Sequence, residues 1–244
     1  MSDIRPGKPK QENPIISILV NIVVPVYIWD QFSGPDKLGP MVALFVGLAF
    51  PLSYGAWDFL RNGRKNWISA LGIVRLVVVG SFAIAEADGI WFAAAEAAFP
   101  ALIAVFIAMS MRSDNPMVKM FLYNDTILDI SKIENRLQVH GKTFEFQRLM
   151  RQVSWLLVFS FALSAVLNFV LARVILKSPA GTEAFSKEFA RMTLLSWPVI
   201  VVPSLIFMGL ALWRLFQGIR KLTGLGFDDI FVGQPAKQSA EGSR

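Results

Sequence analysis

The chain of 244 residues contains no cysteine, one histidine (His140) and three tyrosines. The absence of cysteine excludes a disulfide framework, a cysteine-ligated zinc site and a thiol nucleophile. The sequence also contains none of the H-E-x-x-H, G-x-S-x-G and P-loop lysine motifs that mark common catalytic sites. We therefore expect a protein that is not an enzyme, with no catalytic residue, no cofactor and no metal ion.

Charged residues are scarce as well, at 17% of the chain compared with about 25% in soluble domains. The net charge is nevertheless +6, which is compatible with nucleic-acid binding. No compact run of Lys and Arg supports that interpretation, and basic residues are typical of the cytoplasmic loops of inner-membrane proteins. We therefore expect no nucleic-acid partner and attribute the positive charge to such loops.

Hydrophobic residues, in contrast, make up 54% of the chain and gather in long runs. A hydrocarbon core about 30 Å thick is crossed by about 20 helical residues. Six stretches approach or exceed that length: Ile15–Trp29, Met41–Phe59, Trp67–Ile84, Ile90–Met109, Val153–Ile175 and Met192–Phe216. The first is short and contains Pro25, but no cleavage site follows it, so we expect it to be kept as a helix rather than removed as a signal peptide.

These stretches predict an all-α protein, a polytopic membrane helix bundle of about six transmembrane helices. A soluble domain of this length can bury one such helix in its core, but not six. We place the transmembrane domain at residues 14–221. It follows a disordered N-terminus of residues 1–13 and precedes a flexible tail of residues 222–244, which ends in a polar stretch with Ser, Gly and Lys after Gly233.

The basic residues are distributed unevenly between the predicted loops. Of the 24 Lys and Arg, 18 lie in the N-terminal segment, the second and fourth loops and the C-terminal end, whereas four lie in the other loops. Positively charged loops face the cytoplasm. We therefore expect both termini to be cytoplasmic, in a bacterial inner (cytoplasmic) membrane, which agrees with an even number of spans.

The longest segment between predicted spans, residues 112–152, lies between the fourth and fifth spans on the cytoplasmic side. Ser131 and Glu134 match a capping box at the start of a helix. Gly141 is typical of the end of that helix, and Thr143 can cap a second helix that continues into the fifth span. We therefore predict a cytoplasmic helical hairpin.

Two interpretations of this hairpin remain open. We favour a hairpin that lies on the lipid headgroups with its apolar side down. The alternative is a docking surface for a cytoplasmic protein partner, formed by residues 116–142. In that case Phe121 and Leu122 are the candidate anchors.

Two ionisable residues fall deep inside predicted spans. Arg75 lies about 12 Å into the third span from the cytoplasmic side, and Glu96 about 9 Å into the fourth span from the outer side. Charges at such depth are costly and are usually paired or face a wet cavity. With Asn21 and Asn168, they form a candidate intramembrane polar site for a substrate or a proton. The alternative is a structural role, in which Arg75 and Glu96 pair, or Arg75 reaches the interface and Glu96 stays protonated, and the asparagines join neighbouring helices.

Five prolines also fall within the predicted spans: Pro25, Pro51, Pro100, Pro198 and Pro203. Each removes a helical hydrogen bond and frees a carbonyl. In transporters with broken helices, freed carbonyls bind ions or polar substrates. A kink that shapes the bundle is the more common consequence, and it is the one we expect here.

Three motifs in the later spans are distinctive: Trp91-x4-Glu96-x3-Pro100, the run Leu163–Asn168, and the closing pair Leu195–Pro198 and Gly209–Arg214. Over residues 67–221 the pattern resembles the intracellular septation protein A family of bacterial inner membranes. This chain differs from the family by the inserted segment 112–152 and by a fuller N-terminal pair of spans. The resemblance implies an inner-membrane protein that serves envelope maintenance, septum formation or envelope lipid balance through protein partners. It implies no activity and no functional residue.

Three functions follow from these observations. The first is a non-enzymatic envelope protein that contacts division or lipid-handling partners. The second is a small transporter or lipid flippase with Arg75 and Glu96 near its path and Asn21 and Asn168 as polar lining. The third is an obligate subunit of a larger complex. Membrane lipids surround the protein in all three.

Overall fold

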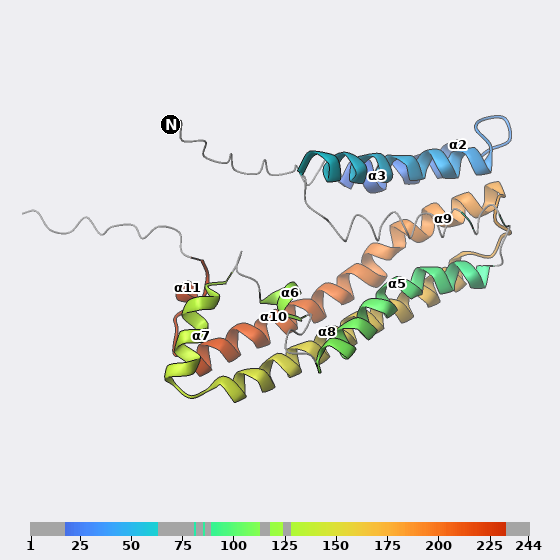
Figure 1. Ribbon diagram of the computed structural model, residues 1–244. Coiled ribbons are helices and arrows are strands. Elements are labelled where there is room, and N and C mark those ends of the chain that lie inside the picture. Colours follow the sequence, from blue (N-terminus) through green and yellow to red (C-terminus); the bar gives the residue numbers. More distant parts are fainter. Residues whose placement is uncertain are drawn as a thin grey trace, which may run out of the picture. The chain divides into compact units, whose positions relative to one another are not determined.

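The computed structural model describes residues 18–62, 81, 85, 89–112, 118–123 and 128–232. Within these ranges the regular structure is helical, and the only β-type pairing is an isolated bridge between Leu128 and Phe231 (Figure 1). The predicted all-α class is therefore confirmed for the described part of the chain. The chain forms two compact units, residues 1–96 with 168–199 and residues 97–167 with 200–244.

Three helices are long and apolar enough to cross a membrane. They are α5 (Gly89–Ser110), α8 (Thr143–Ile175) and the continuous helix Glu183–Thr223, formed by α9 (Glu183–Ser196), η2 (Trp197–Val201) and α10 (Val202–Thr223). Only 33%, 28% and 17% of their respective apolar windows is buried within the chain. Apolar surface of this extent is unfavourable in water, so these helices indicate a membrane protein.

The first two predicted spans correspond to shorter apolar helices. The π-helix η1 (Leu19–Val23) continues into α2 (Val24–Phe32), and α3 covers Pro40–Asn62. The apolar parts of both, Leu19–Phe32 and Pro40–Ser53, have fewer than 18 residues. Almost all of the third predicted span lies outside the described residues. Three membrane-crossing helices thus follow from length and composition, whereas the six-helix bundle stays a prediction.

Prolines mark the places where the helices change their winding. Pro25 stands in the first turn of α2, directly after η1, and Pro203 stands in the first turn of α10, directly after η2, which itself contains Pro198. Proline has no N–H to donate, so the wider π turn accommodates the missing hydrogen bond without ending the helix. Pro51 and Pro100 lie inside α3 and α5.

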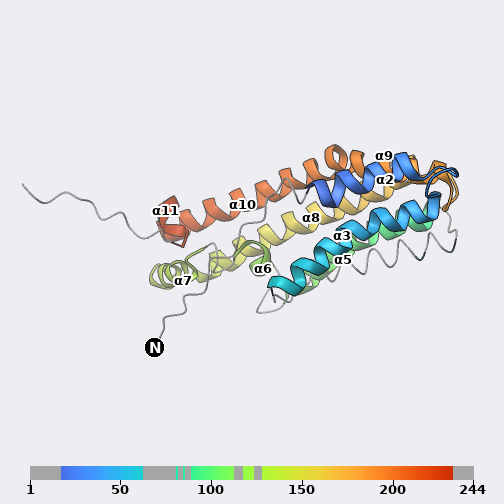
Figure 2. The same cartoon turned by 90° about the horizontal axis from the view of Figure 1, so that it is seen from above.

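The first unit has an aromatic core. Trp29 of α2 packs edge-on against Phe189 of α9, with 4.9 Å between the ring centroids. The Trp29 indole N–H donates a hydrogen bond to the carbonyl of Leu44 in α3, at 3.2 Å. Gly47 permits this approach, because a Cβ there would lie 2.2 Å from the indole nitrogen. One tryptophan therefore holds α2 against both α3 and α9, which are seen from above in Figure 2.

In the second unit, α8 and α10 run antiparallel. Three contacts show this, because the residue number in α10 falls as the residue number in α8 rises. Gln152 pairs with Arg214 at 2.7 Å, Phe159 contacts Phe207 with 4.9 Å between the ring centroids, and the Ser160 hydroxyl donates a hydrogen bond to the Ser204 carbonyl at 3.3 Å. Further along, Gly218 brings α10 close to Leu149, since a Cβ at 218 would lie 2.2 Å from a Leu149 methyl carbon.

Three short helices complete the second unit: α6 (Val118–Leu122), α7 (Ile130–Val139) and α11 (Phe227–Ile230). Together with the start of α8 and the end of α10 they form what we call the α7 subdomain, residues 118–123, 128–150 and 216–232. Its side chains share one hydrophobic core with the adjoining parts of α5, α8 and α10. Leu225 and Ile230 are buried in this core. Within the first part of the predicted flexible tail, Thr223, Leu225 and Ile230 are thus buried, while the rest of that prediction lies outside the described residues or on exposed positions.

Candidate functional site: a basic groove beside the α7 subdomain

The start of α7 is fixed by the C-terminal segment. The N–H of Asp129 donates a hydrogen bond to the carbonyl of Ile230, at 2.9 Å, and Lys132 pairs with Asp229 at 2.6 Å. The carboxylate of Asp129 accepts a hydrogen bond from the N–H of Lys132, at 3.0 Å, and so caps the helix. Asp129 is therefore the N-cap residue, and the predicted capping box of Ser131 and Glu134 is wrong, because the bond to Ile230 starts the helix two residues earlier.

The end of α7 is a Schellman motif. Gly141 has a φ of 64°, its N–H bonds to the carbonyl of Gln138 at 3.0 Å, and the N–H of Lys142 bonds to that of Leu137 at 2.8 Å. This is the end that the sequence predicts at Gly141. His140 is the C-cap residue, and its Nδ1 lies 3.3 Å from the Leu222 carbonyl. It is therefore a helix-end residue.

The apolar side of α7 does not face outward. Ile133 and Leu137 are fully buried or nearly so, in the same core as Leu215 and Ile219 of α10. Because this side is occupied by protein, it is not available to lie on lipid headgroups. The structure thus disagrees with our preferred interpretation of the hairpin. The predicted second helix from Thr143 is present as α8, which continues without a break through a stretch long and apolar enough to cross a membrane.

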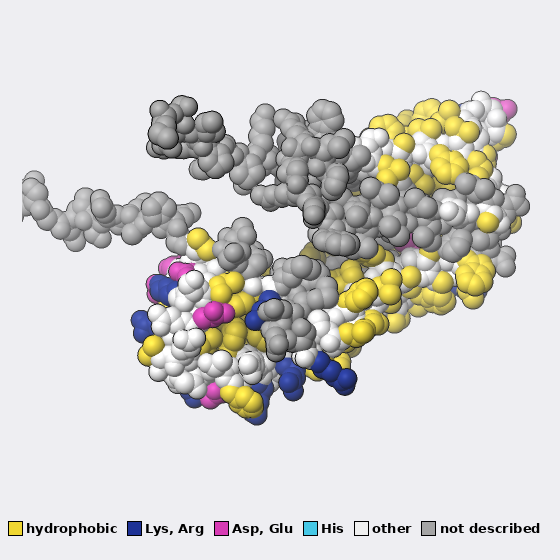
Figure 3. All heavy atoms as spheres, in the orientation of Figure 1, with side chains coloured by type: hydrophobic (Ala, Val, Ile, Leu, Met, Phe, Trp, Pro, Cys, Tyr) yellow, Lys and Arg dark blue, Asp and Glu magenta, His cyan; other side chains and the backbone are white. Residues whose placement is uncertain are grey.

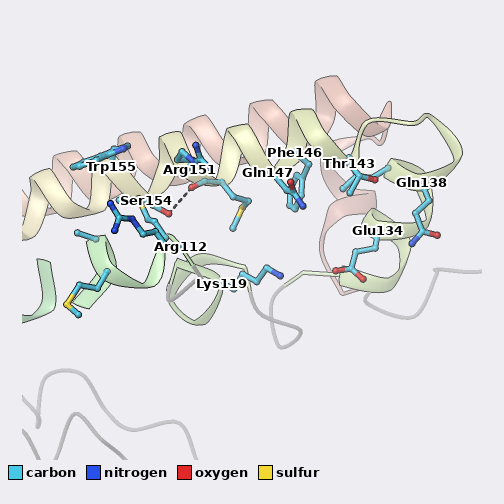
Figure 4. Close-up of a pocket in the computed structure, with 15 residues that line it drawn as sticks. Arg112, Lys119, Glu134, Gln138, Thr143, Phe146, Gln147, Arg151, Ser154 and Trp155 are labelled. Carbon is cyan, nitrogen blue, oxygen red and sulfur yellow. Dashed lines mark hydrogen bonds between the residues drawn. The ribbon is translucent and has the colours of Figure 1, made fainter. Parts of the chain in front are cut away.

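An open groove of about 1390 Å³ runs along α8 in this unit (Figure 4). One wall is a stripe of α8 at four-residue spacing, Thr143, Gln147, Arg151 and Trp155, which places these residues on one helix face. The other walls come from the end of α5, from α6 and from α7. We call this feature the basic groove.

Charge is distributed unevenly in the basic groove. Arg112 follows α5, Lys119 belongs to α6 and Arg151 to α8, whereas Glu134 of α7 is the one carboxylate among the described lining residues. Glu134 and Gln138 lie toward the Thr143 end in Figure 4, about 12 Å along α8 from Arg151. Within the described part of the chain, Arg112, Lys119 and Arg151 make no ion pair and no side-chain hydrogen bond. Among the described residues, the groove therefore has a positive end, at Arg112 and Arg151, with no carboxylate paired to it.

A buried phenol lies beside the groove. Tyr123 is 3% exposed and packs on Phe146, with 5.3 Å between the ring centroids. Burial, together with the nearby charge of Glu134, raises the pKa of Tyr123 far above its usual value, so the phenol stays neutral. Its hydroxyl has no hydrogen-bond partner among the described residues.

The predicted intramembrane polar site is only partly described. Glu96 of α5 is buried, with 4% of its surface exposed, and Asn21 of η1 and Asn168 of α8 are half-buried. All three belong to the first unit, and each has an interaction partner. Arg75 lies outside the described residues. Whether these four residues form one site stays a prediction.

The two predicted partner anchors, Phe121 and Leu122, are not shown as exposed contact residues. Leu122 is 6% exposed and belongs to the core of the α7 subdomain, so it cannot contact a partner in this conformation. The side chain of Phe121 lies outside the described part of the structure. The exposed large apolar residues of the subdomain are instead Val139, Phe144, Phe227 and Val232. The two most exposed of them, Val139 at 71% and Phe144 at 66%, lie on either side of the turn between α7 and α8.

Sequence reasoning missed Val139 and Phe144, although a signal for them exists. The buried residues of α8 follow helical spacing from Phe146 through Leu149 and Val153, and Phe144 does not belong to that series. An apolar residue off the buried stripe of an amphipathic helix is a candidate contact residue.

Within the described residues, no group of three or more His, Asp and Glu side chains is placed to hold a metal ion. Comparison with family models, with curated proteins and with solved structures finds no match for this chain. The resemblance to the septation protein A family therefore stays a prediction.

Proposed function

We propose that this chain is a multi-pass protein of the bacterial inner membrane, with both termini in the cytoplasm. In this proposal it serves cell-envelope maintenance or septation without catalysis, and it acts through protein partners that contact the α7 subdomain. The observation that carries the proposal is a folded, partly apolar subdomain at the charged end of membrane-length helices.

The length of the uncharged stretch in α8 supports the placement of the α7 subdomain at a membrane surface. In α8 the stretch between Arg151 and Arg173 contains no charge and extends for about 30 Å at 1.5 Å per residue, which matches a hydrocarbon core. Trp155 is exposed one turn inside Arg151, and on the final helix Trp213 is exposed beside Arg214. Tryptophan is typical of the membrane–water interface. The α7 subdomain thus begins where the hydrocarbon core ends.

The charge of this end supports its cytoplasmic placement. Lys and Arg side chains gather over α7 and the start of α8 on the face shown in Figure 3. Exposed basic residues of this end include Arg112, Arg136, Arg148, Arg151 and Arg220. An excess of basic residues next to a span is retained on the cytoplasmic side.

The partner surface that we propose is the pair Val139 and Phe144. Both are exposed next to the turn between α7 and α8, whose backbone is fixed by the two hydrogen bonds of the Schellman motif. Arg148 lies over the Phe144 ring, with 5.4 Å from its guanidinium carbon to the ring centroid. An exposed aromatic residue beside an arginine is a composition enriched at binding hot spots.

The test is site-specific photo-crosslinking in intact cells. A photoreactive residue at 139 and, separately, at 144 is expected to capture the same envelope or division protein, and Phe144→Ser should remove the adduct formed from position 139. The matched control is position 135, where Asn135 is exposed and polar on the same helix as Val139. Equal capture from position 135, or different proteins captured from 139 and 144, would contradict the proposed surface.

A small transporter or lipid flippase is the second candidate, because Glu96 is a buried acid within an apolar helix. Flux through proteoliposomes distinguishes it from the first. Transport predicts that Glu96→Gln abolishes flux and that Phe144→Ser leaves it unchanged. If a substrate flux is found and Glu96→Gln does not alter it, the polar site has no transport role.

A further inference from the structure

The basic groove combines two features that normally occur apart. Arg112 and Arg151 stand directly at the ends of uncharged helical stretches, which is the level of lipid phosphates in a bilayer. The same groove is lined by Met109 and Trp155, whose side chains are 67% and 57% exposed and belong to the membrane-facing surface. A ligand in the groove therefore meets cations and hydrocarbon-facing side chains together.

We propose that the basic groove binds the headgroup of an anionic phospholipid from the adjacent leaflet, with Arg112 and Arg151 contacting its phosphate oxygens and Lys119 further along the groove (Figure 4). The inference deepens the proposed function and rests on it only for the placement of this end at a membrane surface. Partner binding by Val139 and Phe144 is not needed for it.

Charge and geometry both favour such a ligand. Among the described lining residues, Arg112 and Arg151 have no ion pair and lie at the end of the groove away from Glu134, with Lys119 between them and Glu134 (Figure 4). Guanidinium groups bind phosphate oxygens in a bidentate way, and basic recesses between membrane helices on the cytoplasmic side are suited to anionic headgroups. A zwitterionic headgroup would bring its own cation into this positive end and is expected to bind less well.

A lipid fits the groove better than a soluble phosphate compound. Trp155 and Met109 provide an apolar wall that a free phosphate would leave in contact with water. The glycerol backbone and the first methylene groups of a lipid would cover that wall while its phosphate stays at the arginines. In this proposal the groove is open toward the bilayer at Met109 and Trp155.

The test uses the full-length chain in nanodiscs of phosphatidylcholine that contain a minor fraction of phosphatidylglycerol. Phosphatidylglycerol retained after extraction is counted by native mass spectrometry. Each Arg contact removed is expected to lower the apparent affinity about fivefold, so the double variant Arg112→Gln/Arg151→Gln should lose about 25-fold. Restoring position 151 as lysine, in Arg112→Gln/Arg151→Lys, should recover about fivefold.

The matched control is Arg148→Gln/Arg220→Gln, which removes two exposed charges at the same end of the unit without touching the groove. It is expected to keep phosphatidylglycerol binding within twofold of the unaltered chain. Thermal unfolding in pure phosphatidylcholine serves as the folding control for both double variants. Equal losses in the two double variants would overturn the proposal, because binding would then follow net charge alone.

Soluble phosphate compounds form the second arm. Inorganic phosphate and glycerol 1-phosphate, added in detergent, are expected to leave the retained phosphatidylglycerol unchanged. Displacement at matching concentrations would assign the groove to soluble phosphates and overturn the lipid proposal. Recovery of the chain without detergent in a soluble fraction would refute the proposed function itself, whereas unselective lipid retention by a detergent-extracted chain would refute only this inference.

Discussion

Replacing Ile230 with alanine tests whether the C-terminal segment holds the α7 subdomain together. Ile230 is fully buried in the core that contains Ile133 and Leu137, and its carbonyl accepts the hydrogen bond from Asp129 that starts α7. The substitution removes apolar side-chain atoms and leaves the backbone hydrogen bond chemically possible. Any loss of protection at Asp129 therefore reports on packing.

The magnitude follows from the atoms that are lost. Three carbon groups at about 0.8 kcal/mol each give about 2.4 kcal/mol, and a residual cavity adds to this. The segment around Ile230 is short and near the surface, so it can partly collapse into the space. We therefore expect a loss of about 3 kcal/mol, within the range of about 2–5 kcal/mol for such substitutions in cores.

Hydrogen exchange provides the assay, in detergent micelles or nanodiscs. A loss of about 3 kcal/mol raises the opening equilibrium about 150-fold, so the amide of Asp129 should exchange faster by about two orders of magnitude. The control is Val232→Ala, two residues away, since Val232 is 52% exposed and should cost less than about 0.5 kcal/mol. Similar exchange rates in the two variants would refute the role given to Ile230.

Three further predictions concern close packing and charge. Gly218→Ala should destabilise the second unit by about 1–3 kcal/mol in denaturant unfolding because the new methyl group meets buried leucine atoms at 2.2 Å, whereas Gly209→Ala in the same helix meets nothing within 4 Å and should be neutral or slightly stabilising. Gly47→Ala should displace the indole ring that it contacts and shift the tryptophan emission, with a similar loss of stability; an unchanged spectrum would contradict the packing described for the first unit. The hydrogen bond from Lys132 lowers the pKa of Asp229, so the pair contributes its full stabilisation of the α7 subdomain at pH values above the ordinary aspartate pKa of about 4. This contribution is lost as the pH falls through the lower pKa of the folded state. Proteolysis of the subdomain should increase over that pH range, and Lys132→Gln should remove this pH dependence.

The three membrane-length helices could be predicted from sequence because length and apolarity alone define them. Their limits could not be predicted in the same way. Hydropathy places the start of the last span at Met192, yet the helix begins at Glu183 after Thr182, whose hydroxyl accepts a hydrogen bond from the N–H of Phe185 at 3.1 Å. Hydropathy reports transfer into lipid, whereas a helix continues through charged residues as long as its backbone hydrogen bonds do.

The boundaries and core of the α7 subdomain could not be predicted from local sequence alone. Asp129 and Ser131 are both good N-cap residues, and the choice between them depends on a hydrogen bond to Ile230, which is far away in sequence. Leu225 and Ile230 stand in a short segment rich in Gly that is typical of a tail, and only the core reveals that they are buried. Tertiary contacts of this kind leave no periodic pattern in the chain.

The candidate site was even less visible. Arg112, Lys119 and Arg151 contributed to the sequence argument only as members of a charge count, because nothing in their spacing relates them. They line one groove because α5, α6 and α8 share a unit. A single sequence predicts charge balance and helix length well, but it does not predict which side chains from separate helices lie together.

The most direct test of the account is single-cysteine labelling, for which the chain is ready because it contains no cysteine of its own. Asn135→Cys in the α7 subdomain should react with a membrane-impermeant maleimide only in inside-out vesicles, and Lys187→Cys at the charged start of α9 only in intact cells with a permeabilised outer layer. Phe159→Cys, within the uncharged stretch of α8, should react in neither. Labelling of positions 135 and 187 from the same side, or free reaction of position 159, would contradict the claim that these helices cross a membrane with the α7 subdomain at its cytoplasmic surface.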